Sequence, residues 1–423
     1  MNRRLILGSL CTVMAFVVPS SLPASAAAPK LSHETVLSGL ENPWDMAFLP
    51  DGTMFFTEKC KGLSVRMPSG DVNKLLGMKD SDGYPSKGED LFCEGQAGMQ
   101  GVAIDPEFDK NRTIYVYSTS NNPAPGVNRV MRLKVAGGFD NVSDRTDIVD
   151  DIQYKPKATD HPFGGPGAHN GGRLRWNPGD GYLYVTTGDT HNGEVPQSPT
   201  KIGGKVLRID RDGKAAAENK PPEGFDKRIY TYGHRNPQGI AFRPGDNQPV
   251  TAEHGPWHND EITVLELGGN AGWDPAPNRG GRGDCPDNYC GYMPNQMEGM
   301  DPKERMKFTP MTDTKTYPDA MPPAWTNNNK SQGTSSAAFL EGDQWGDWDG
   351  RMVVGVMGIG FGGTPVGQRI DVIKLSKDGK SAEVESLPFP SAAGRFRSVV
   401  QGPDGSLYAA VDEGVIHKLT PKK

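Results

Sequence analysis

The sequence predicts an all-β protein folded as a six-bladed β-propeller. Three observations support this prediction: a β-hairpin pattern recurs six times, the spacing of the copies suits radial repetition, and the chain is rich in turn-forming residues. Its 423 residues include 54 glycines and 36 prolines, which favour many short strands over long helices. Closed all-β rings often reach this length as one unit, so we expect a single domain.

Each copy of the repeat begins with a short apolar strand, passes through a turn containing Pro, Gly, Asp or Asn, and ends in a second run of β-forming residues. Such a hairpin cannot bury its apolar surface alone, and stacking the copies around an axis solves that problem. The copies are more widely spaced than the roughly 40 to 45 residues of a minimal blade, which leaves long loops to build a site at the mouth of the ring. They span residues 44–57, 101–117, 172–186, 239–252, 336–354 and 398–410.

The two ends of the chain are expected to close the ring. An open last blade would expose a strand edge, and the early segment 33–40 can pair with the final strand, which includes residues 415–419. A row of β-sandwiches is the alternative, but it suits six irregularly spaced hairpins less well. The longest interval between copies contains the Gly-, Asn- and Pro-rich stretch 278–332, which we interpret as a surface excursion.

The first 26 residues have the pattern of a secretory signal peptide, which leaves residues 27–423 as the propeller. The pattern consists of two early arginines, a mostly apolar run at 5–18 and small residues at 24–26. We therefore expect a secreted or periplasmic protein, with an uncleaved membrane anchor as the alternative.

Two kinds of partner are not expected. The formal net charge is −6 and the lysines and arginines are scattered along the chain, which argues against nucleic acid. No apolar run after the N-terminus approaches the roughly 20 residues needed to cross a bilayer, which argues against stable membrane insertion.

Removal of the signal peptide would leave four cysteines in an oxidising compartment, where disulfides persist. Three pairings are possible. We favour Cys285 with Cys290, because a short Pro-Asp-Asn-Tyr loop can bring them together, which leaves Cys60 with Cys93. The spacings do not resemble those of a zinc site.

Four polar segments between or beside the strands are candidates for function, because binding and catalytic residues concentrate on loops carried by a rigid scaffold. The first, residues 164–172, is rich in glycine and contains His169, whose imidazole titrates near neutral pH. The second places Arg235, Asn236 and Gln238 just before a strand, a set that suits recognition of a carboxylate or carbonyl.

The third segment, 253–261, is rich in the oxygen donors that calcium prefers, although it lacks EF-hand spacing. The fourth carries Arg395 and Arg397, two cations on one face at strand spacing, which can hold an anionic ligand. Taken singly, a loop histidine or alternating arginines are more often structural or solvated. Because all four segments border hairpins, we expect them to converge on one end of the ring.

Six segments, in this order, resemble the soluble glucose/sorbosone dehydrogenase family: residues 42–44, 96–101, 169–174, 232–239, 253–256 and 394–397. The His-Arg-Asn-Pro-Gln-Gly and Glu-His-Gly-Pro segments are the specific ones. That family uses pyrroloquinoline quinone held by calcium in the propeller mouth. The resemblance therefore implies oxidation of the anomeric C1 hydroxyl of an aldose sugar to a lactone, with electrons passed to an external acceptor.

The resemblance also implies a role for each candidate residue. His169 would take the hydroxyl proton as general base while hydride passes to the quinone, and Arg235 would stabilise negative charge on the quinone oxygen. It further implies hydrogen bonds to the cofactor from Gln96, Asn236 and Gln238, and pairing of the cofactor carboxylates with Arg395 and Arg397. The carbonyl groups of Gly255 and Pro256 would ligate the calcium that holds the cofactor. Glu261 and Ala271 would bind a second, structural calcium.

The sequence departs from the family at two places on the expected cofactor wall. Family members often carry a lysine after the fifth-blade strand, where this chain reads Gly355 to Gly360 without one. Residues 332–336 stand where a Pro-Ser-Gly turn is usual. Both changes bear on how tightly the quinone is held.

Two other functions stay open at this point. A calcium-dependent lactonase or esterase could use His169 to activate water near a metal, and ester turnover without quinone would indicate it. A non-catalytic binding propeller that lost the cofactor is the other, because a fold does not fix a function. The missing lysine favours a non-catalytic binding propeller, whereas the retained histidine and arginines argue against it.

Overall fold

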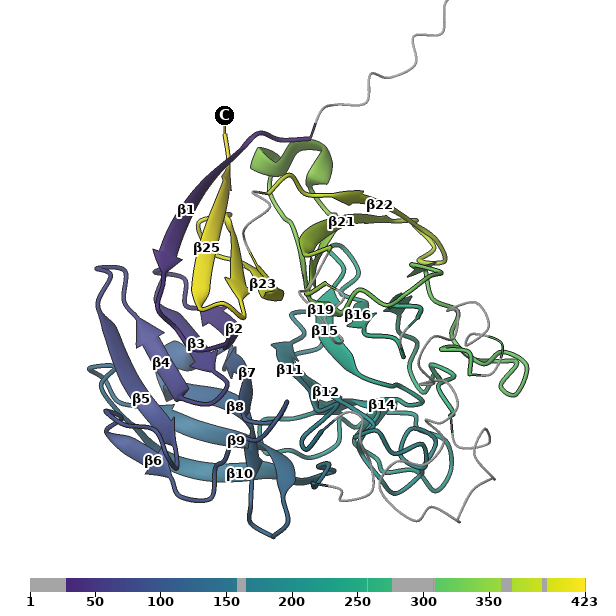
Figure 1. Ribbon diagram of the computed structural model, residues 1–423, viewed down its shortest axis with the longest axis horizontal. Coiled ribbons are helices and arrows are strands. Elements are labelled where there is room, and N and C mark those ends of the chain that lie inside the picture. Colours follow the sequence, from purple (N-terminus) through teal and green to yellow (C-terminus); the bar gives the residue numbers. More distant parts are fainter. Residues whose placement is uncertain are drawn as a thin grey trace, which may run out of the picture.

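Six β-sheets surround a central axis in the part of the chain that the structure describes (Figure 1). The structure is a computed structural model, and it describes residues 28–157, 165–256, 258–275, 307, 309–358, 367–389 and 394–422. The innermost strands of neighbouring sheets contact one another in a closed ring. The predicted six-bladed β-propeller is therefore confirmed.

The first three blades follow the order of the predicted hairpins. Blade one comprises β2 (Pro43–Phe48), β3 (Met54–Glu58), β4 (Gly62–Arg66), β5 (Val72–Met78) and the short parallel strand β6 (Ser86–Gly88). Blade two comprises β7 (Met99–Ile104), the helical turn α1 (Phe108–Asn111), β8 (Thr113–Ser120), β9 (Val127–Val135) and β10 (Val142–Ile152). Blade three comprises β11 (Gly171–Trp176), β12 (Leu183–Thr187), β13 (Val206–Ile209) and β14 (Ile229–Thr231).

The last three blades repeat the pattern, and in every blade the predicted hairpin forms the two innermost strands. Blade four comprises β15 (Pro237–Phe242), β16 (Pro249–Glu253), β17 (Glu261–Val264) and β18 (Trp325–Thr326). Blade five comprises β19 (Thr334–Phe339), the 3-10 helix η2 (Asp343–Trp348), β20 (Met352–Val356), β21 (Arg369–Leu375) and β22 (Ala382–Ser386). Blade six comprises β23 (Phe396–Gln401), β24 (Leu407–Val411), β25 (Val415–Pro421) and β1 (Leu31–Leu37).

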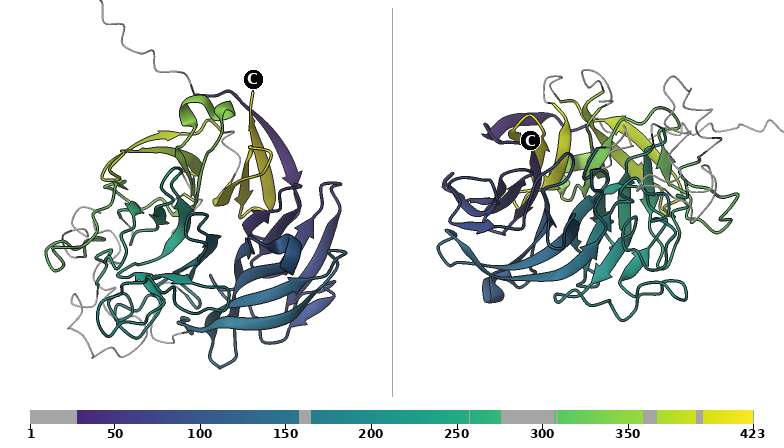
Figure 2. Two further views of the ribbon diagram at one scale, coloured as in Figure 1. Left: turned by 180° about the vertical axis from the view of Figure 1, so that it is seen from behind. Right: turned by 60° about the horizontal axis from the view of Figure 1, so that its bottom comes forward.

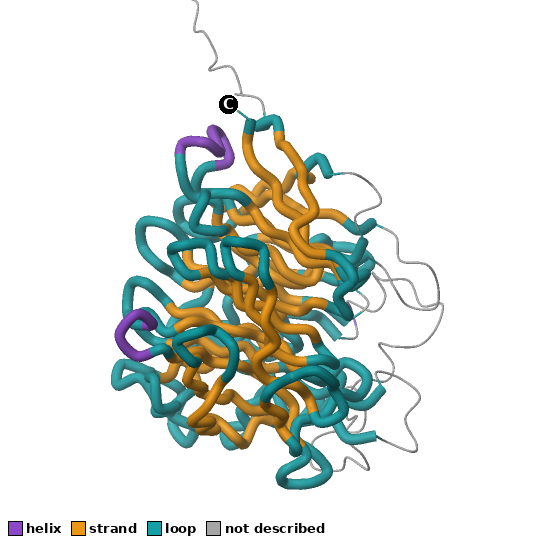
Figure 3. The backbone as a smooth tube through the Cα atoms, turned by 90° about the vertical axis from the view of Figure 1, so that its left-hand side faces the viewer, coloured by secondary structure: helices purple, strands orange, loops and turns teal. Residues whose placement is uncertain are grey.

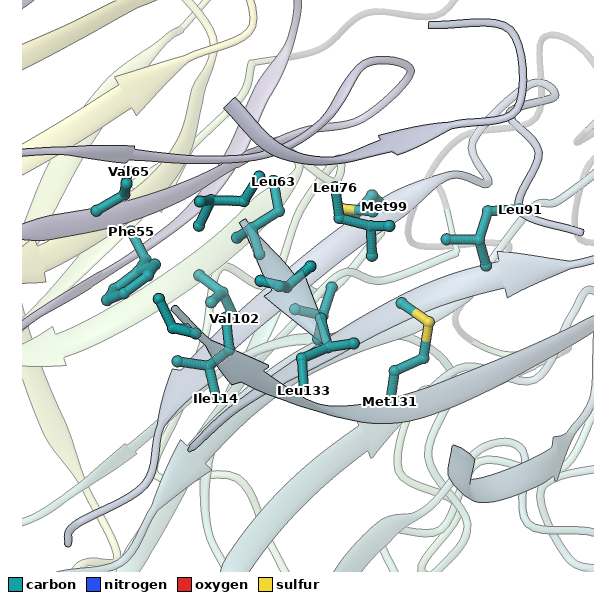
Figure 4. Close-up of a cluster of buried hydrophobic side chains, with 14 of the residues drawn as sticks. Phe55, Leu63, Val65, Leu76, Leu91, Met99, Val102, Ile114, Met131 and Leu133 are labelled. Atoms are coloured by element: carbon teal, nitrogen blue, oxygen red, sulfur yellow. The ribbon is translucent and has the colours of Figure 1, made fainter. Parts of the chain in front are cut away.

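Adjacent blades pack face to face because successive residues of a strand point to opposite faces of its sheet. Phe55 of β3 packs between blades one and two, whereas Phe56 packs between blades one and six. In the same way, Ile114 of β8 packs between blades one and two, whereas Tyr115 packs between blades two and three. Figure 4 shows the cluster between blades one and two. These inner strands must be apolar on both faces, which is why each reads as a run of β-forming residues.

Strand β1 closes the ring by pairing with the last strand, β25 (Figures 1 and 2). The register places Leu31 opposite Pro421. The pairing predicted for segment 33–40 is confirmed, with the strand itself at Leu31–Leu37. It covers the strand edge that β25 would otherwise expose.

Seen from the side, the strands occupy the middle of the disc and the loops lie on its two faces (Figure 3). Most of the stretch 278–307 within the predicted surface excursion lies outside the described residues. The end of that excursion returns to the sheet, because Trp325 and Thr326 form β18 and pair with β17. This outermost strand was not predicted from the sequence, because two residues are too few to show a repeating pattern.

The segment 1–26, predicted to be a signal peptide, lies outside the described residues. Its boundary with the propeller therefore stays a prediction. Across the part of the chain that the structure covers, no helix is both long and apolar enough to cross a membrane.

A disulfide between Cys60 and Cys93 joins the β3–β4 turn of blade one to the loop that precedes blade two. This is one of the two pairs that the sequence favours. The other pair, Cys285 and Cys290, lies outside the described residues. The bond ties together two segments that reach the mouth of the ring.

Replacing both Cys60 and Cys93 by serine is expected to lower the free energy of unfolding by about 3–4 kcal/mol. The cross-linked residues are 33 positions apart, and closing a loop of that length removes a corresponding entropy from the unfolded chain. Urea unfolding followed by circular dichroism measures the change. A midpoint equal to that of the wild type would contradict it.

Candidate functional site

Segments from all six blades meet at one mouth of the ring. In an antiparallel hairpin the start of the first strand lies beside the end of the second, and both segments contribute here. They line a cavity of about 400 Å³, a size typical of small-molecule sites. Its lining comprises Trp44, Lys59, Gln96, Gln100, Asn170, Gly171, Gln238, His254, Ser331, Gly333, Met357, Gly358, Arg395 and Arg397.

The seven residues that the sequence predicts for catalysis and cofactor binding converge on this cavity. Four of them line it directly: Gln96, Gln238, Arg395 and Arg397. The other three are buried and lie next to the lining: His169 immediately precedes Asn170, Asn236 Oδ1 accepts a hydrogen bond from Gly171 N–H at 3.0 Å, and the guanidinium of Arg235 donates to the carbonyl oxygen of His254 at 2.6 Å.

His169, just before β11, is oriented by a carboxylate at the end of β12. Its Nδ1 lies 2.7 Å from Oδ1 of Asp189, which is fully buried. The same carboxylate accepts hydrogen bonds from Trp273 Nε1 at 2.8 Å and from the backbone N–H of His191 at 3.0 Å. A neutral imidazole whose Nδ1 donates to a carboxylate presents Nε2 as its proton acceptor. This arrangement suits a general base.

A glycine allows these two segments to approach each other. A Cβ atom at Gly188 would lie 2.1 Å from the carbonyl oxygen of His169, far closer than real contacts allow. Any side chain at this position would push Asp189 and His169 apart. On the other side, Gln96 Oε1 accepts a hydrogen bond from the backbone N–H of His169 at 3.3 Å.

The surroundings of His169 keep its imidazole neutral at neutral pH. Burial, followed by the positive charge of Arg235, holds the pKa of His169 well below its usual 6.5. His254 on the cavity wall behaves similarly. Burial lowers the pKa of His254 to about 4, although Asp260 opposes the shift. Both histidines are therefore unprotonated at neutral pH.

Glu253, at the end of β16, fixes the segment that carries Arg235 and Asn236. Its Oε1 accepts hydrogen bonds from the backbone N–H groups of both residues. Its Oε2 lies 2.8 Å from Nδ1 of His234. The His-Arg-Asn-Pro-Gln-Gly and Glu-His-Gly-Pro segments are thus two sides of one buried hydrogen-bond network.

Arg395 and Arg397, at the start of β23, share the carboxylate of Asp412, which follows β24. Arg397 donates to it through Nε and Nη2, each at 2.8 Å, and Arg395 donates through Nε at 3.1 Å. Although burial opposes the shift, the two cations hold the pKa of Asp412 below its ordinary value. Arg397 also donates to Gln238 Oε1 at 3.1 Å. Because two arginines share one carboxylate, this wall of the cavity keeps a net positive charge.

Deeper along the inner strands, the fully buried Arg173 holds four blades together. Its guanidinium pairs with Asp45 at 2.5 Å and lies 4.2 Å from the ring of Trp44 in blade one. It also donates to the carbonyl oxygens of Gln238 at 3.0 Å in blade four and of Arg397 at 3.2 Å in blade six. These contacts fix the spacing of the strands that carry the site.

A model of the glucose/sorbosone dehydrogenase family matches residues 40–418. The chain belongs to this family. The match reaches from before β2 into β25, so it includes every segment that lines the cavity. The resemblance predicted from the sequence is confirmed, and the chain is an oxidoreductase of the sugar dehydrogenase type.

Three similar proteins illustrate the family. The aldose sugar dehydrogenase of Escherichia coli is 28% identical over 415 residues, covering 96% of this chain and 98% of the relative. Quinoprotein glucose dehydrogenase B of Acinetobacter calcoaceticus is 30% identical over 295 residues, covering 62% of this chain and 57% of the relative. The PQQ-bound aldose sugar dehydrogenase of Streptomyces coelicolor has a similar fold, with a TM-score of 0.65 at 22% identity, covering 93% of this chain and 99% of that one.

The residues that the family resemblance assigns to calcium lie beside the Glu253 network. Gly255 and Pro256 are buried just after β16, and Ala271 is also buried. Glu261 is buried and accepts a hydrogen bond from Thr312 Oγ1 at 3.0 Å; burial raises the pKa of its carboxyl well above the usual range. Within the described residues, no three His, Cys, Asp or Glu side chains are grouped to hold a metal. Calcium in this region would need backbone carbonyl oxygens in addition to any side-chain carboxylate.

The fifth-blade wall, where the sequence departs from the family, is uncharged in its described part. Blade five contributes Ser331, Gly333, Met357 and Gly358 to the cavity. Arg395 reaches this wall, because its Nη1 donates to the carbonyl oxygen of Met357 at 3.1 Å. The following residues, 359–366, lie outside the described part of the chain.

Sequence reasoning missed several residues that shape the site: Asp189 beside His169, Asp412 beside the arginines, and Lys59 on the cavity wall. All three follow the end of the second strand of a hairpin. Most of the polar segments singled out in the sequence lie before the first strand of a hairpin. A charged residue within two positions of the end of a second strand was the signal that could have found them.

Proposed function

We propose that this protein is a pyrroloquinoline quinone-dependent aldose dehydrogenase that oxidises the anomeric C1 hydroxyl of a sugar to a lactone. The observation that carries the proposal is the His169–Asp189 pair, with its neutral imidazole beside a cation-lined cavity. Membership of the sugar dehydrogenase family supports the choice of substrate.

The chemistry of the cavity fits a quinone that carries carboxylates. Its volume of about 400 Å³ accommodates a small planar ligand. Arg395 and Arg397 would pair with the ligand's carboxylates, because each guanidinium has N–H groups beyond those that bind Asp412. Gln96, Asn236 and Gln238 would add hydrogen bonds. The quinone bound by the Streptomyces coelicolor relative supports this assignment.

The protein's own residues would handle the proton and the charge. When bound, the quinone supplies the hydride acceptor. His169 would take the proton of the sugar's C1 hydroxyl at Nε2, while Asp189 holds Nδ1–H and so fixes the direction of the ring. Arg235, fixed through the Glu253 network, would stabilise negative charge that develops on the ligand.

Calcium would complete the site. The carbonyl groups of Gly255 and Pro256 would ligate a cofactor-bound ion, and Glu261 with the carbonyl group of Ala271 would hold a second, structural ion. The raised pKa of Glu261 indicates a carboxyl that a nearby cation would return to its ionised form. Electrons would leave through an external acceptor, and the predicted signal peptide would direct the protein out of the cytoplasm.

Reconstitution tests the proposal directly. Purified protein is incubated with quinone and calcium, and dye reduction is followed with a panel of aldoses. We expect turnover that requires both additions. Absence of bound quinone together with absence of turnover would contradict the proposal, and hydrolysis of esters without quinone would instead indicate a lactonase or esterase.

The pH dependence of this activity is a further prediction. Because the pKa of His169 is lowered, the imidazole loses its proton at a lower pH than an ordinary histidine and stays a competent base as the pH falls through 6.5. The acid limb of kcat/KM should therefore lie well below pH 6.5. A pH series with the loaded enzyme measures it, and a limb above pH 6.5 would contradict the assignment of His169 as the base.

A further inference from the structure

Lys59 is a cation of the cavity wall that the assigned roles leave unused. It follows β3, and its side chain lines the cavity together with Arg395 and Arg397. Two backbone hydrogen bonds fix its position: its N–H donates to the carbonyl oxygen of Asn42 at 3.1 Å, and its carbonyl oxygen accepts from Met99 N–H at 2.8 Å. The next residue forms the disulfide to Cys93. The backbone of Lys59 is thus held on both sides.

Among the described residues, no carboxylate forms an ion pair with Lys59, whereas both arginines bind Asp412. In the part of the chain that the structure describes, Lys59 Nζ donates a hydrogen bond to the carbonyl oxygen of Gly95 at 2.8 Å. An ammonium has three N–H groups, so this arrangement leaves donors for a ligand.

The electrostatic environment also disfavours a bare ammonium here. Burial, followed by repulsion from Arg397, lowers the pKa of Lys59, and the attraction of Asp412 only partly compensates. An anion in the cavity would reverse both effects, since it would screen the repulsion and accept hydrogen bonds from Nζ. In the described part of this wall, the three cations Lys59, Arg395 and Arg397 have one ion-paired carboxylate, Asp412, between them.

We propose that Lys59 binds a carboxylate of the quinone directly and so supplies, from blade one, a cation that the described fifth-blade wall lacks. This inference rests on the proposed function, because the ligand is the same quinone. It adds a binding residue to a cavity whose blade-five lining includes the uncharged residues Met357 and Gly358, and it assigns the cofactor a third cationic contact.

The test compares quinone binding by wild-type protein, Lys59→Met and Lys59→Arg, measured as the dissociation constant from quenching of tryptophan fluorescence in the presence of calcium. Methionine keeps the unbranched stem and removes the charge. We expect Lys59→Met to weaken binding by about 10- to 100-fold, as loss of a hydrogen bond to a charged group does. Lys59→Arg should recover most of the affinity.

Two controls separate this contact from a structural effect. Lys61→Met removes a neighbouring cation that is partly exposed and paired with Glu41 at 2.9 Å, so affinity should stay at the wild-type value. The trimethyl ester of the quinone lacks carboxylate charge, so its weaker binding should be equal in wild type and Lys59→Met. A loss of ester binding in Lys59→Met would show a structural role and overturn the inference.

The outcomes distinguish the two proposals. If wild-type protein binds the quinone and Lys59→Met binds it equally well, the inference about Lys59 is wrong and the proposed function stands. If wild-type protein binds no quinone, the proposed function and the inference both fail.

Discussion

Replacing His169 by glutamine is expected to lower kcat for aldose oxidation by about 10²- to 10⁴-fold, the usual contribution of a positioned general base. Glutamine retains a polar side chain that can bind the Asp189 carboxylate but cannot take up a proton at neutral pH. Dye reduction by quinone- and calcium-loaded protein measures the loss. The dissociation constant of the quinone should change little, because His169 is buried next to the cavity lining and has no cofactor-holding role in the proposal.

Two further variants make the His169 prediction specific. Asp189→Asn should lower kcat by a smaller factor, because it leaves the imidazole in place but replaces one of the two accepting oxygens by an N–H₂ donor and so weakens the control of the imidazole tautomer. His33→Gln alters a histidine on β1 that contacts His417 of β25, and it should leave kcat unchanged. Wild-type turnover in His169→Gln would show that another group removes the proton.

Replacing Asp45 by asparagine is expected to lower the free energy of unfolding by about 3–5 kcal/mol, the usual cost of removing one partner of a buried ion pair. Asp45 is fully buried and pairs with both Arg173 and Arg175. Although burial opposes the shift, these two cations hold the pKa of Asp45 below its ordinary value. The substitution would leave two guanidinium groups without a carboxylate at the centre of the ring.

A double variant separates the ion pair from its surroundings. Asp45→Asn combined with Arg173→Met should be less destabilised than the sum of the two single variants, because the second change removes the uncompensated charge. Asp82→Asn alters an exposed carboxylate of blade one and should leave stability near the wild-type value. Urea unfolding midpoints decide the comparison. Strict additivity of the two changes would contradict a direct coupling.

The ring and its closure could be predicted from the sequence because each hairpin repeats a local pattern. The runs at residues 44–57 and 398–410, for example, contain both strands and the turn between them. Pairing of β1 with β25 followed from a general rule, since a propeller with an open last blade would expose a strand edge. The outermost strand β18 was not predictable in this way, because it has two residues and pairs across a long interval.

The candidate site was predictable in part for a similar reason. His169, Arg235 and Arg397 lie in segments with distinctive composition, and a ring topology brings such segments to one mouth. Their partners are less visible, because Asp189 and Asp412 are single acidic residues after ordinary strands. What identifies them is a contact across the hairpin, which depends on register and on the close approach at Gly188.

The charge of the cavity wall was also beyond sequence reasoning. Lys59 follows a strand that the sequence analysis placed in the first hairpin, and nothing local marks its side chain as lining the cavity. The blade arrangement brings it to the same wall as Arg395 and Arg397. The charge of the cavity wall therefore depends on residues of several blades together, and no single segment of the sequence reveals it.

A single-turnover experiment tests the central claim most directly. Protein loaded with quinone and calcium is mixed with excess aldose under anaerobic conditions without dye, and the absorbance of the bound quinone and the amount of lactone are measured together. One lactone should form for each quinone reduced, and His169→Gln should slow both changes equally. An unchanged quinone spectrum without lactone, or oxidation of the sugar at a carbon other than C1, would contradict that claim.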